Sequence, residues 1–188
     1  KKVKECYENG YSIIIIGDKN HPEVVGINGW CDDCAYIINS EADVDTIPSL
    51  KKVCIVAQTT ITNEKFEKLS ELISSKCDEA EVHNTICSAT HVRQQSCKEV
   101  AKKVDAMIVI GGYHSSNTQK LVDISKEYCN NVYHIETVEE LPLDKLTNFE
   151  SIGITAGAST PDWILEEVYN KMNDTFNENN DMLKLLNE

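Results

Sequence analysis

The sequence contains few glycines and prolines, little positive charge and no long hydrophobic segment. Among its 188 residues there are 8 glycines and 4 prolines, and 41% of the residues are apolar. This composition excludes collagen-like and disordered chains, and the length allows one sizeable core or two small ones. The longest apolar runs, Tyr11 to Ile16 and Met107 to Ile110, fall far short of the roughly 20 residues that a membrane-spanning helix requires. We therefore expect a soluble protein.

Basic residues are a clear minority. Lys and Arg number 18 against 31 Asp and Glu, which gives a formal net charge of −13. Such a charge repels nucleic acids and anionic membranes unless a local basic stripe overcomes it. Because the sequence has no such stripe, we expect neither a membrane nor a nucleic acid as the partner of this chain.

The eight cysteines do not indicate a disulfide framework, which is typical of much smaller secreted proteins. The sequence opens with Lys-Lys-Val-Lys and shows no apolar signal segment, so we expect a reducing compartment, the cytoplasm. A polar opening that runs directly into a strand pattern, without an initial methionine, indicates a piece of a longer protein.

Short β-rich runs alternate with helical patterns, which indicates an α/β fold with mainly parallel sheets. Strands are expected over 12–16, 53–57, 80–83, 106–110, 132–135 and 151–155, and helices over 3–7, 63–74, 92–104, 117–128 and 161–172. Six strands fit one doubly wound sheet, but both halves repeat a strand-loop-helix order. We therefore favour two small three-layer domains, 1–84 and 85–172, with 173–188 as a linker or tail helix.

Ligands of parallel sheets bind beyond the carboxyl ends of the strands, so the loops there hold the candidate site residues. Two of these loops each open a helix, where hydroxyls, free backbone N–H groups and the helix dipole together suit a phosphate. The candidates are Ser115, Ser116, Asn117 and Ser159. Ordinary helix capping is the alternative, and it is favoured for Thr160-Pro161-Asp162.

His21-Pro22-Glu23 forms a second candidate. Proline favours an extended backbone at His21, and residues two apart in an extended stretch point to the same side, so the imidazole and the carboxylate are expected to share a cleft. Glu23 would then donate a proton and His21 would anchor an anion, whereas a solvated pair on a turn is the alternative. Thr59, just after a buried strand, would extend a proton-bearing hydrogen-bond network.

Cys87 is the most informative cysteine, because it lies after a predicted strand and before a predicted helix, whose N-terminus favours the thiolate. Cys31 and Cys34 enclose two acidic residues and have no second pair, so neither zinc nor redox chemistry is expected there. The other five are expected to serve packing or to lie on the surface: Cys6, Cys54, Cys77, Cys97 and Cys129.

Five sequence motifs follow one another along the chain in an order that is typical of one protein family. They are Asn-His-Pro-Glu-Val-Val-Gly at 20–26, Ala-Gln-Thr-Thr at 57–60, Asn-Thr-Ile-Cys-Ser-Ala-Thr at 84–90, Gly-Gly-x-x-Ser-Ser-Asn-Thr at 111–118 and Gly-Ile-Thr-Ala-Gly-Ala-Ser-Thr-Pro-Asp at 153–162. Together they closely resemble the 4-hydroxy-3-methylbut-2-enyl diphosphate reductase family, also called IspH or LytB, over about residues 1–172.

The resemblance implies reductive dehydroxylation of that diphosphate to isopentenyl and dimethylallyl diphosphate, in the non-mevalonate isoprenoid pathway. It implies a trefoil of three α/β domains, of which this chain holds the second and third, and a [4Fe-4S] cluster with three cysteine ligands. By motif, Cys87 would be one cluster ligand, Glu23 the proton donor and Thr59 part of its network. The diphosphate would be bound by His21, Ser115, Ser116, Asn117 and Ser159.

Intact family members carry a preceding domain and two further cluster cysteines, so the chain alone is expected to hold no cluster and to be inactive. A ferredoxin- or flavodoxin-type protein is the expected electron donor, and nucleic acid is a partner only if an S1-type extension follows. One rival hypothesis is a non-catalytic anion-binding α/β module. Another makes Cys87 a covalent nucleophile with His83 or His91 as its base.

Overall fold

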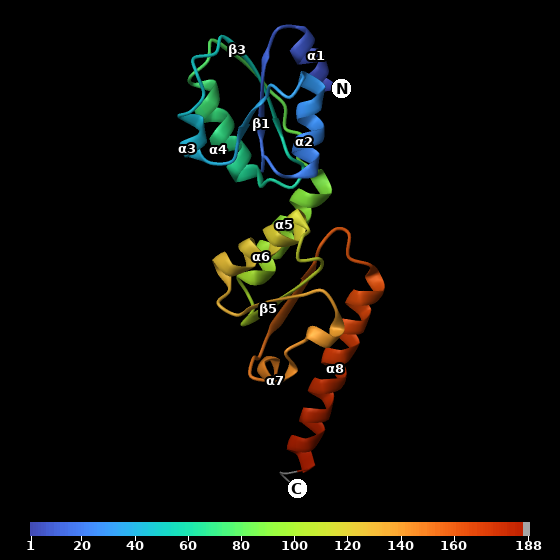
Figure 1. The fold of residues 1–188 in the computed structure, drawn as a ribbon. Helices are drawn as coiled ribbons and strands as arrows, with labels where there is room; N and C mark the ends of the chain where they lie inside the picture. The colour runs from blue at the N-terminus through green and yellow to red at the C-terminus, as the bar shows by residue number, and fades with distance from the viewer. Residues whose placement is uncertain (186–188) are drawn as a thin grey trace. The chain divides into compact units, whose positions relative to one another are not determined.

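The computed structural model describes the backbone of residues 1–185 and the side chains of residues 1–176. The chain divides into two compact units, the first from Lys1 to His91 and the second beginning at Val92 (Figure 1). Each unit has its own parallel sheet, and each is described by itself. The predicted α/β class with parallel sheets is confirmed.

The first unit contains a four-stranded parallel sheet in the order β2-β1-β3-β4. Its strands are β1 (Ser12–Ile16), β2 (Tyr36–Ile38), β3 (Lys52–Ala57) and β4 (Glu79–Val82). Its helices are α1 (Lys2–Glu8), α2 (Pro22–Asn28), the 3-10 turn η1 (Gly29–Cys31), α3 (Glu41–Val44) and α4 (Asn63–Ser74). Helices α1 and α2 cover one face of the sheet, and α3 and α4 cover the other (Figure 1).

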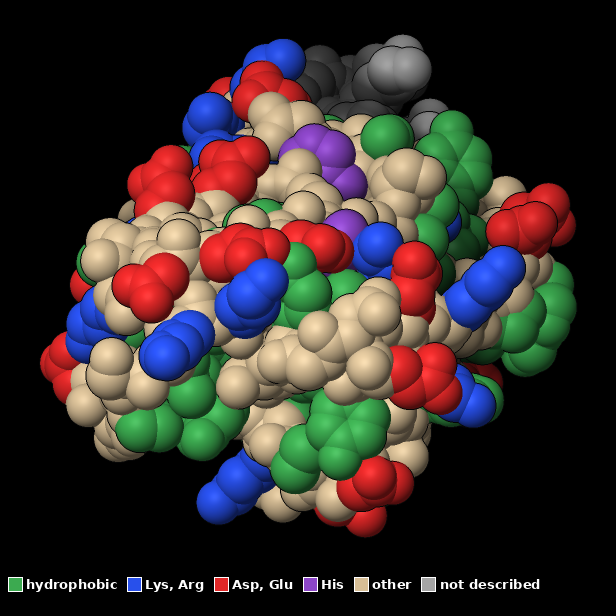
Figure 2. Space-filling model, turned by 90° about the horizontal axis from the view of Figure 1, so that it is seen from above, with side chains coloured by type: hydrophobic (Ala, Val, Ile, Leu, Met, Phe, Trp, Pro, Cys, Tyr) green, Lys and Arg blue, Asp and Glu red, His purple; other side chains and the backbone are tan. Residues whose placement is uncertain are grey.

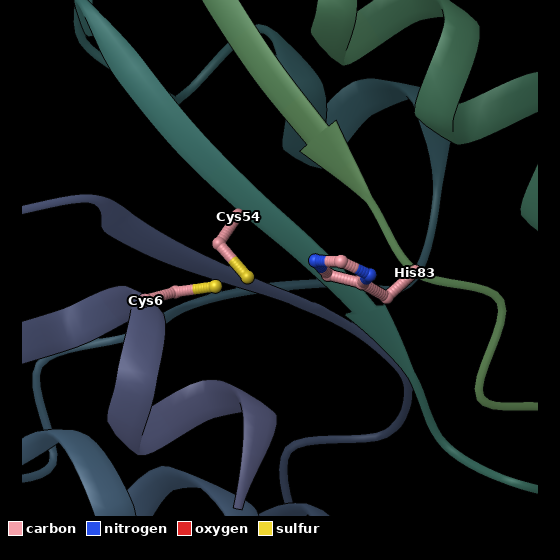
Figure 3. A group of neighbouring side chains, drawn as sticks. All are labelled: Cys6, Cys54 and His83. Carbon is pink, nitrogen blue, oxygen red and sulfur yellow. The ribbon is translucent and has the colours of Figure 1, made fainter. Parts of the chain in front are cut away.

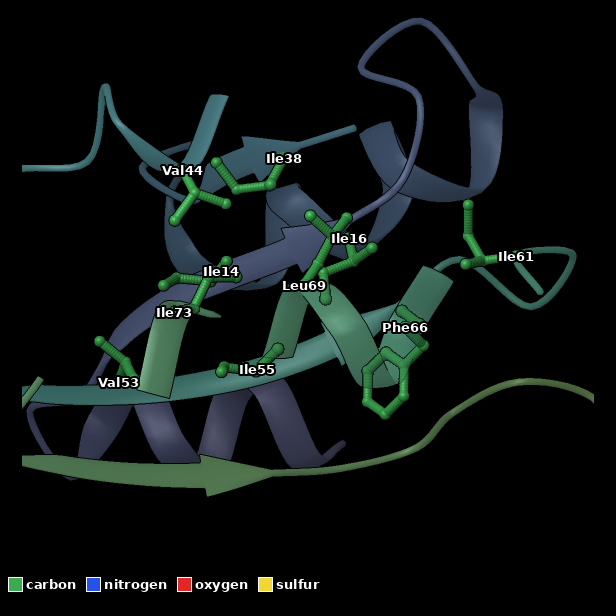
Figure 4. Packing of buried hydrophobic residues seen from close by; sticks show 11 residues of the cluster. Ile14, Ile16, Ile38, Val44, Val53, Ile55, Ile61, Phe66, Leu69 and Ile73 are labelled. Carbon is green, nitrogen blue, oxygen red and sulfur yellow. The ribbon is translucent and has the colours of Figure 1, made fainter. Parts of the chain in front are cut away.

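Strand β1 is buried on both faces, as the isoleucine run predicts. Ile14 and Ile16 pack with Leu69 and Ile73 of α4 in one cluster (Figure 4), whereas Ile13 and Ile15 pack toward α1 and α2 in another. Successive side chains of a strand point to opposite faces, so four consecutive isoleucines supply both cores at once. The unit is therefore a three-layer sandwich.

The second unit repeats this plan with three parallel strands in the order β6-β5-β7. The strands are β5 (Ala106–Ile110), β6 (Val132–Ile135) and β7 (Ile152–Ala156). The helices are α5 (Ser88–Ala101), which begins in the first unit, α6 (Ser116–Tyr128), the 3-10 turn η2 (Val138–Glu140), α7 (Leu143–Leu146) and α8 (Asp162–Leu185). One core lies toward α5 and α6 and the other toward α7 and α8.

Several elements differ from the prediction, which did not include the short helices α2, α3 and α7. The second strand, β2, is missing from the prediction because only three residues form it. Helix α5 begins at Ser88, four residues before the predicted start. Helix α8 continues past residue 172 to Leu185. The segment 173–185, expected to be a linker or a tail helix, is therefore helical, and residues 186–188 lie outside the described ones.

On the face drawn in Figure 2, Lys and Arg side chains are scattered among acidic ones, with no continuous basic stripe. Among the described residues, no helix is long and apolar enough to cross a membrane.

Candidate functional site

Three loops meet at the carboxyl edge of the first sheet. They follow β1 at Gly17, β3 at Gln58 and β4 at His83. Backbone bonds tie them to each other: the N–H of Gln58 donates to Ile16 at 2.9 Å, and the N–H of Cys87 donates to Thr59 at 3.1 Å. The sheet thus brings together loops that lie far apart in the sequence, where a parallel sheet is expected to bind ligands.

Glu23 and Thr59 form the central pair at this edge. The Thr59 hydroxyl donates to Glu23 Oε2 at 2.9 Å, and the Thr59 backbone N–H lies 3.1 Å and 3.2 Å from the two carboxylate oxygens. Both residues are half-buried. A carboxylate held by two donors of one residue has a defined orientation, which is what proton transfer to a bound substrate requires.

The local geometry at His21 differs from the sequence prediction. His21 is extended, as expected, but Pro22 begins α2, so Glu23 lies in the first turn of a helix and not in an extended stretch. Proline suits the first helical position because its missing N–H is not needed there. His21 Nδ1 therefore caps the helix by accepting from the Glu23 backbone N–H at 3.2 Å, while the Glu23 carboxylate contacts Thr59.

Gln58 fixes the loop beside this pair. It is buried, and its Oε1 accepts from the backbone N–H of Asp18 at 3.0 Å, while its Nε2 donates to the Thr60 hydroxyl at 2.7 Å. A Cβ at Gly17 would lie 2.8 Å from Val24 and 3.0 Å from the Gln58 side chain. The close approach of these loops therefore depends on the glycine.

Cys87 lies immediately before α5 and is exposed. Hydrogen bonds from the backbone N–H groups of Thr90 and Ala89 lower the pKa of its thiol, while the Glu23 carboxylate acts in the opposite direction. A helix N-terminus stabilises a thiolate in this way. Cys87 thus lies directly before a helix, as predicted, where backbone N–H groups favour its thiolate.

The two histidines considered as bases for Cys87 have other partners. His83 Nε2 lies 3.1 Å from Glu81 Oε2, and His91 Nδ1 lies 3.1 Å from the Asn63 amide nitrogen. No hydrogen bond joins either ring to Cys87 among the described residues, so the geometry does not favour a Cys-His nucleophile.

In the second unit, the loop after β5 opens α6. Ser115 is the N-cap, and its hydroxyl accepts from the Thr118 backbone N–H at 3.3 Å. Asn117 is buried, yet both atoms of its side-chain amide lack a partner among the described residues. A buried amide without a partner costs about 1–3 kcal/mol. A ligand at this helix N-terminus that accepted from the amide nitrogen would remove the part of that cost that belongs to the donor.

The loops after β5 and β7 pack closely. A Cβ at Gly111 would lie 2.7 Å from Thr160 Oγ1, and a Cβ at Gly157 would lie 2.3 Å from Thr118 Oγ1. Gly111 also has a φ of +143°, a conformation that favours glycine. The Thr160 hydroxyl donates to the carbonyl oxygen of Ile110 at 3.0 Å, and α8 begins at Asp162. The Thr160 hydroxyl thus joins two loops, and the predicted helix start at Pro161 moves by one residue.

Ser159 is exposed in the loop between β7 and α8. Arg93, which the sequence reading missed, lies on α5 and donates from Nη1 to the carbonyl oxygen of Ala156 at 3.1 Å, at the end of β7. It brings a cation to the start of the loop 157–161, and neither this loop nor the loop 111–117 contains a Lys or Arg. No local pattern marks Arg93, because its partner is 63 residues away.

Comparisons with known proteins agree on one family. The LytB protein family matches residues 1–173. A 4-hydroxy-3-methylbut-2-enyl diphosphate reductase from Alkaliphilus oremlandii is 54% identical over 172 residues, which are 91% of this chain and 62% of the relative. The reductase of the same name from Caldanaerobacter subterraneus is 51% identical and covers 90% of this chain and 59% of its own length.

Solved structures are also similar. The E-1-hydroxy-2-methyl-but-2-enyl-4-diphosphate reductase from Plasmodium falciparum aligns with a TM-score of 0.81 at 32% identity, over 90% of this chain and 54% of that one. A structure described as the terminal enzyme of the non-mevalonate pathway, an (E)-4-hydroxy-3-methyl-but-2-enyl diphosphate reductase, aligns with a TM-score of 0.56 at 42% identity, over 92% of this chain and 62% of that one. The chain spans about 60% of the length of its first relatives, and it belongs to the LytB protein family.

Proposed function

We propose that the whole protein to which this chain belongs reduces 4-hydroxy-3-methylbut-2-enyl diphosphate to isopentenyl and dimethylallyl diphosphate. The proposal rests on family membership and on the Glu23–Thr59 pair beside an ionisable Cys87. The allylic carbon–oxygen bond breaks, two electrons enter from a ferredoxin- or flavodoxin-type donor, one proton makes the departing hydroxyl into water, and another joins the carbon skeleton. The cytoplasm is the proposed compartment.

The two units would be the second and third α/β domains of a three-domain protein, and the [4Fe-4S] cluster of the family would have Cys87 as one ligand. The fit is supported by this chain: the thiol is exposed, and backbone N–H groups lower its pKa, as an iron ligand that must be a thiolate requires. When bound, the cluster would supply the two electrons and Lewis-acid chemistry for loss of the hydroxyl.

Glu23 would donate the proton to the departing hydroxyl. Its carboxylate is oriented by Thr59, whose hydroxyl is 2.9 Å away and able to pass a proton to it. Two donors from one residue hold the acid in place without a cation, so the carboxylate stays available to the substrate.

The diphosphate would be bound mainly by neutral groups. In the second unit these are the exposed hydroxyl of Ser159, the hydroxyls of Ser115 and Ser116 at the start of α6, and the unpartnered amide of Asn117. Hydroxyls, amides and a helix N-terminus bind phosphate without a formal positive charge. His21 in the first unit would add an imidazole.

The experiment compares the 188-residue chain with a form extended at its N-terminus, after anaerobic reconstitution with iron and sulfide. We expect iron and visible absorbance only in the extended form, and reductase activity with a competent electron donor. In that form, Glu23→Gln should lower kcat by about 100-fold or more. Glu67→Gln, at an exposed glutamate of α4, serves as the control.

The rival function is a non-catalytic anion-binding module, which the helix-start loops alone would support. An extended protein that takes up no iron but binds inorganic pyrophosphate would favour that rival. An iron-loaded protein in which Glu23→Gln turns over at the normal rate would refute the assigned proton donor.

A further inference from the structure

Four potential metal ligands converge on one face of the first sheet. Cys6 lies on α1, Cys54 on β3, Glu81 on β4 and His83 just after it. The two sulfurs and a ring nitrogen of His83 all lie within 4.8 Å of one another (Figure 3). Glu81 Oε2 lies 3.6 Å from Cys6 Sγ and 3.1 Å from His83 Nε2. The carboxylate therefore contacts both ends of the group.

The fold explains why these side chains meet. Strands β3 and β4 are parallel, and their register pairs Cys54 with Glu81. His83 follows Glu81 by two residues and so points to the same face of the sheet. Helix α1 covers that face and places Cys6 beside Cys54 in the same hydrophobic cluster. These elements are separated by dozens of residues, so no ligand spacing is visible in the sequence.

We propose that Cys6, Cys54, Glu81 and His83 bind one zinc-type divalent cation with tetrahedral coordination. Thiolate, imidazole and carboxylate are the donors that Zn²⁺ takes in proteins, and four of them close a structural site. Glu81 Oε2 lies beside two of these donors. The two sulfurs and the His83 ring nitrogen are all within 4.8 Å of one another, which suits a single ion. They would be too close to bind three different irons of a four-iron cluster, so the site is separate from Cys87 and does not depend on the proposed function.

Burial and charge favour an ion here over an empty group. Cys6 and Cys54 are 2% and 0% exposed. Zinc would displace the thiol protons, as binding to cysteines requires. Two thiolates and a carboxylate exceed the charge of the ion by one, and Lys2 Nζ, 3.8 Å from Glu81 Oε2, offsets that excess.

The ion would join α1, the central strand β3 and the edge strand β4. None of the four side chains of β4 is fully buried, whereas five of the six side chains of β3 are. A tether at Glu81 and His83 would stabilise this edge, because an ion that binds only the folded state adds its binding free energy to folding.

The test uses the whole 188-residue chain, reduced and freed of metal with a chelator. Co²⁺ is titrated first, because tetrahedral Co²⁺ with thiolate ligands gives visible d–d bands and near-ultraviolet charge-transfer bands. Zn²⁺ is then added to displace it, and thermal unfolding is followed with and without Zn²⁺. The variants are Cys6→Ser, Cys54→Ser and His83→Gln, with Cys97→Ser, another buried cysteine, and Cys34→Ser, from the Cys-x-x-Cys pair, as controls.

We expect one equivalent of Co²⁺ in the parent chain and in both controls, with displacement by one equivalent of Zn²⁺ and a Zn²⁺-dependent rise in Tm. Affinity should fall about 100-fold or more in the ligand variants, since even loss of an outer-shell partner costs 10–100-fold. His83 is partly exposed, so His83→Gln should fold even if Cys54→Ser does not. Absence of thiolate–cobalt bands in the parent chain, or an unchanged Co²⁺ affinity in His83→Gln, would overturn the proposal.

Discussion

Thr59 contacts the Glu23 carboxylate through both its hydroxyl, at 2.9 Å, and its backbone N–H, at 3.1 Å. The two residues are 36 positions apart, and the contact joins the end of β3 to the first turn of α2. Because the backbone donor persists in any Thr59 variant, the contribution of the hydroxyl is open to separate measurement.

Thr59→Val should lower kcat of the N-terminally extended, cluster-loaded protein about 10- to 100-fold. The substitution removes the hydroxyl bond to a charged acceptor, which is worth about 1.5–3 kcal/mol, and 1.4 kcal/mol corresponds to a factor of 10. Thr59→Ser retains a hydroxyl and should restore most of the rate. Equal rates for the valine and serine variants would mean that the hydroxyl has no part in proton delivery.

Cys87 should be alkylated by iodoacetamide at lower pH in the folded chain than in the unfolded one. The folded pKa is lowered, so ionisation contributes stability above the ordinary thiol pKa of about 8.5, and this contribution is lost as the pH falls through the lowered value. Mass spectrometry of the Cys87 peptide, in buffer and in urea, gives both pH profiles. Coincident profiles would show that the helix start does not stabilise the thiolate.

Asn117→Leu should leave the Tm unchanged or raised while it increases the KM for the diphosphate substrate about tenfold or more. Neither amide atom of Asn117 has a partner among the described residues, so an apolar side chain of similar shape removes a cost and breaks no bond. Asn131, whose amide donates to the Asp105 carbonyl at 2.9 Å, is the control: Asn131→Leu should lower the Tm. An unchanged KM for Asn117→Leu would exclude the amide from the diphosphate site.

Gly157→Ala should destabilise the chain by about 1–3 kcal/mol, because the added Cβ would lie 2.3 Å from the hydroxyl of the buried Thr118. Gly26→Ala is the matched control: it lies in α2 with no atom within 4 Å of the added Cβ. It should stabilise by about 0.5–1 kcal/mol, since glycine inside a helix is less favourable than alanine. Chemical denaturation measures both, and equal effects would contradict the packing at Gly157.

Local patterns predicted most of the fold. The isoleucine run of β1 and the apolar run of β5 mark buried strands, and their predicted bounds agree with the structure. The strand β2 was missed because three residues do not form a recognisable alternation, and its pairing with β1 is what stabilises it. Helix α2 was missed because His-Pro was interpreted as extended, although proline also suits a helix start.

Part of the candidate site was also predictable from local sequence patterns. Cys87 lies between a strand and a helix, so its exposure and lowered thiol pKa follow from the start of α5. The direction of the Glu23 side chain was not predictable, because it depends on how α2 packs beside the end of β3. Arg93 was missed for the same reason, since its partner lies at the end of β7.

Consecutive residues are enough to predict the alternation of strands and helices, the burial of the central strands and the polar loops that follow them, because each of these features is local. Three other features arise only when the chain is folded: the contact of Glu23 with Thr59, the packing of Gly157 against Thr118 and the meeting of Cys6, Cys54 and His83. Such contacts depend on strand order and register and on which sheet face each helix covers. Burial of the whole hydrophobic surface sets these, so no local pattern reports them.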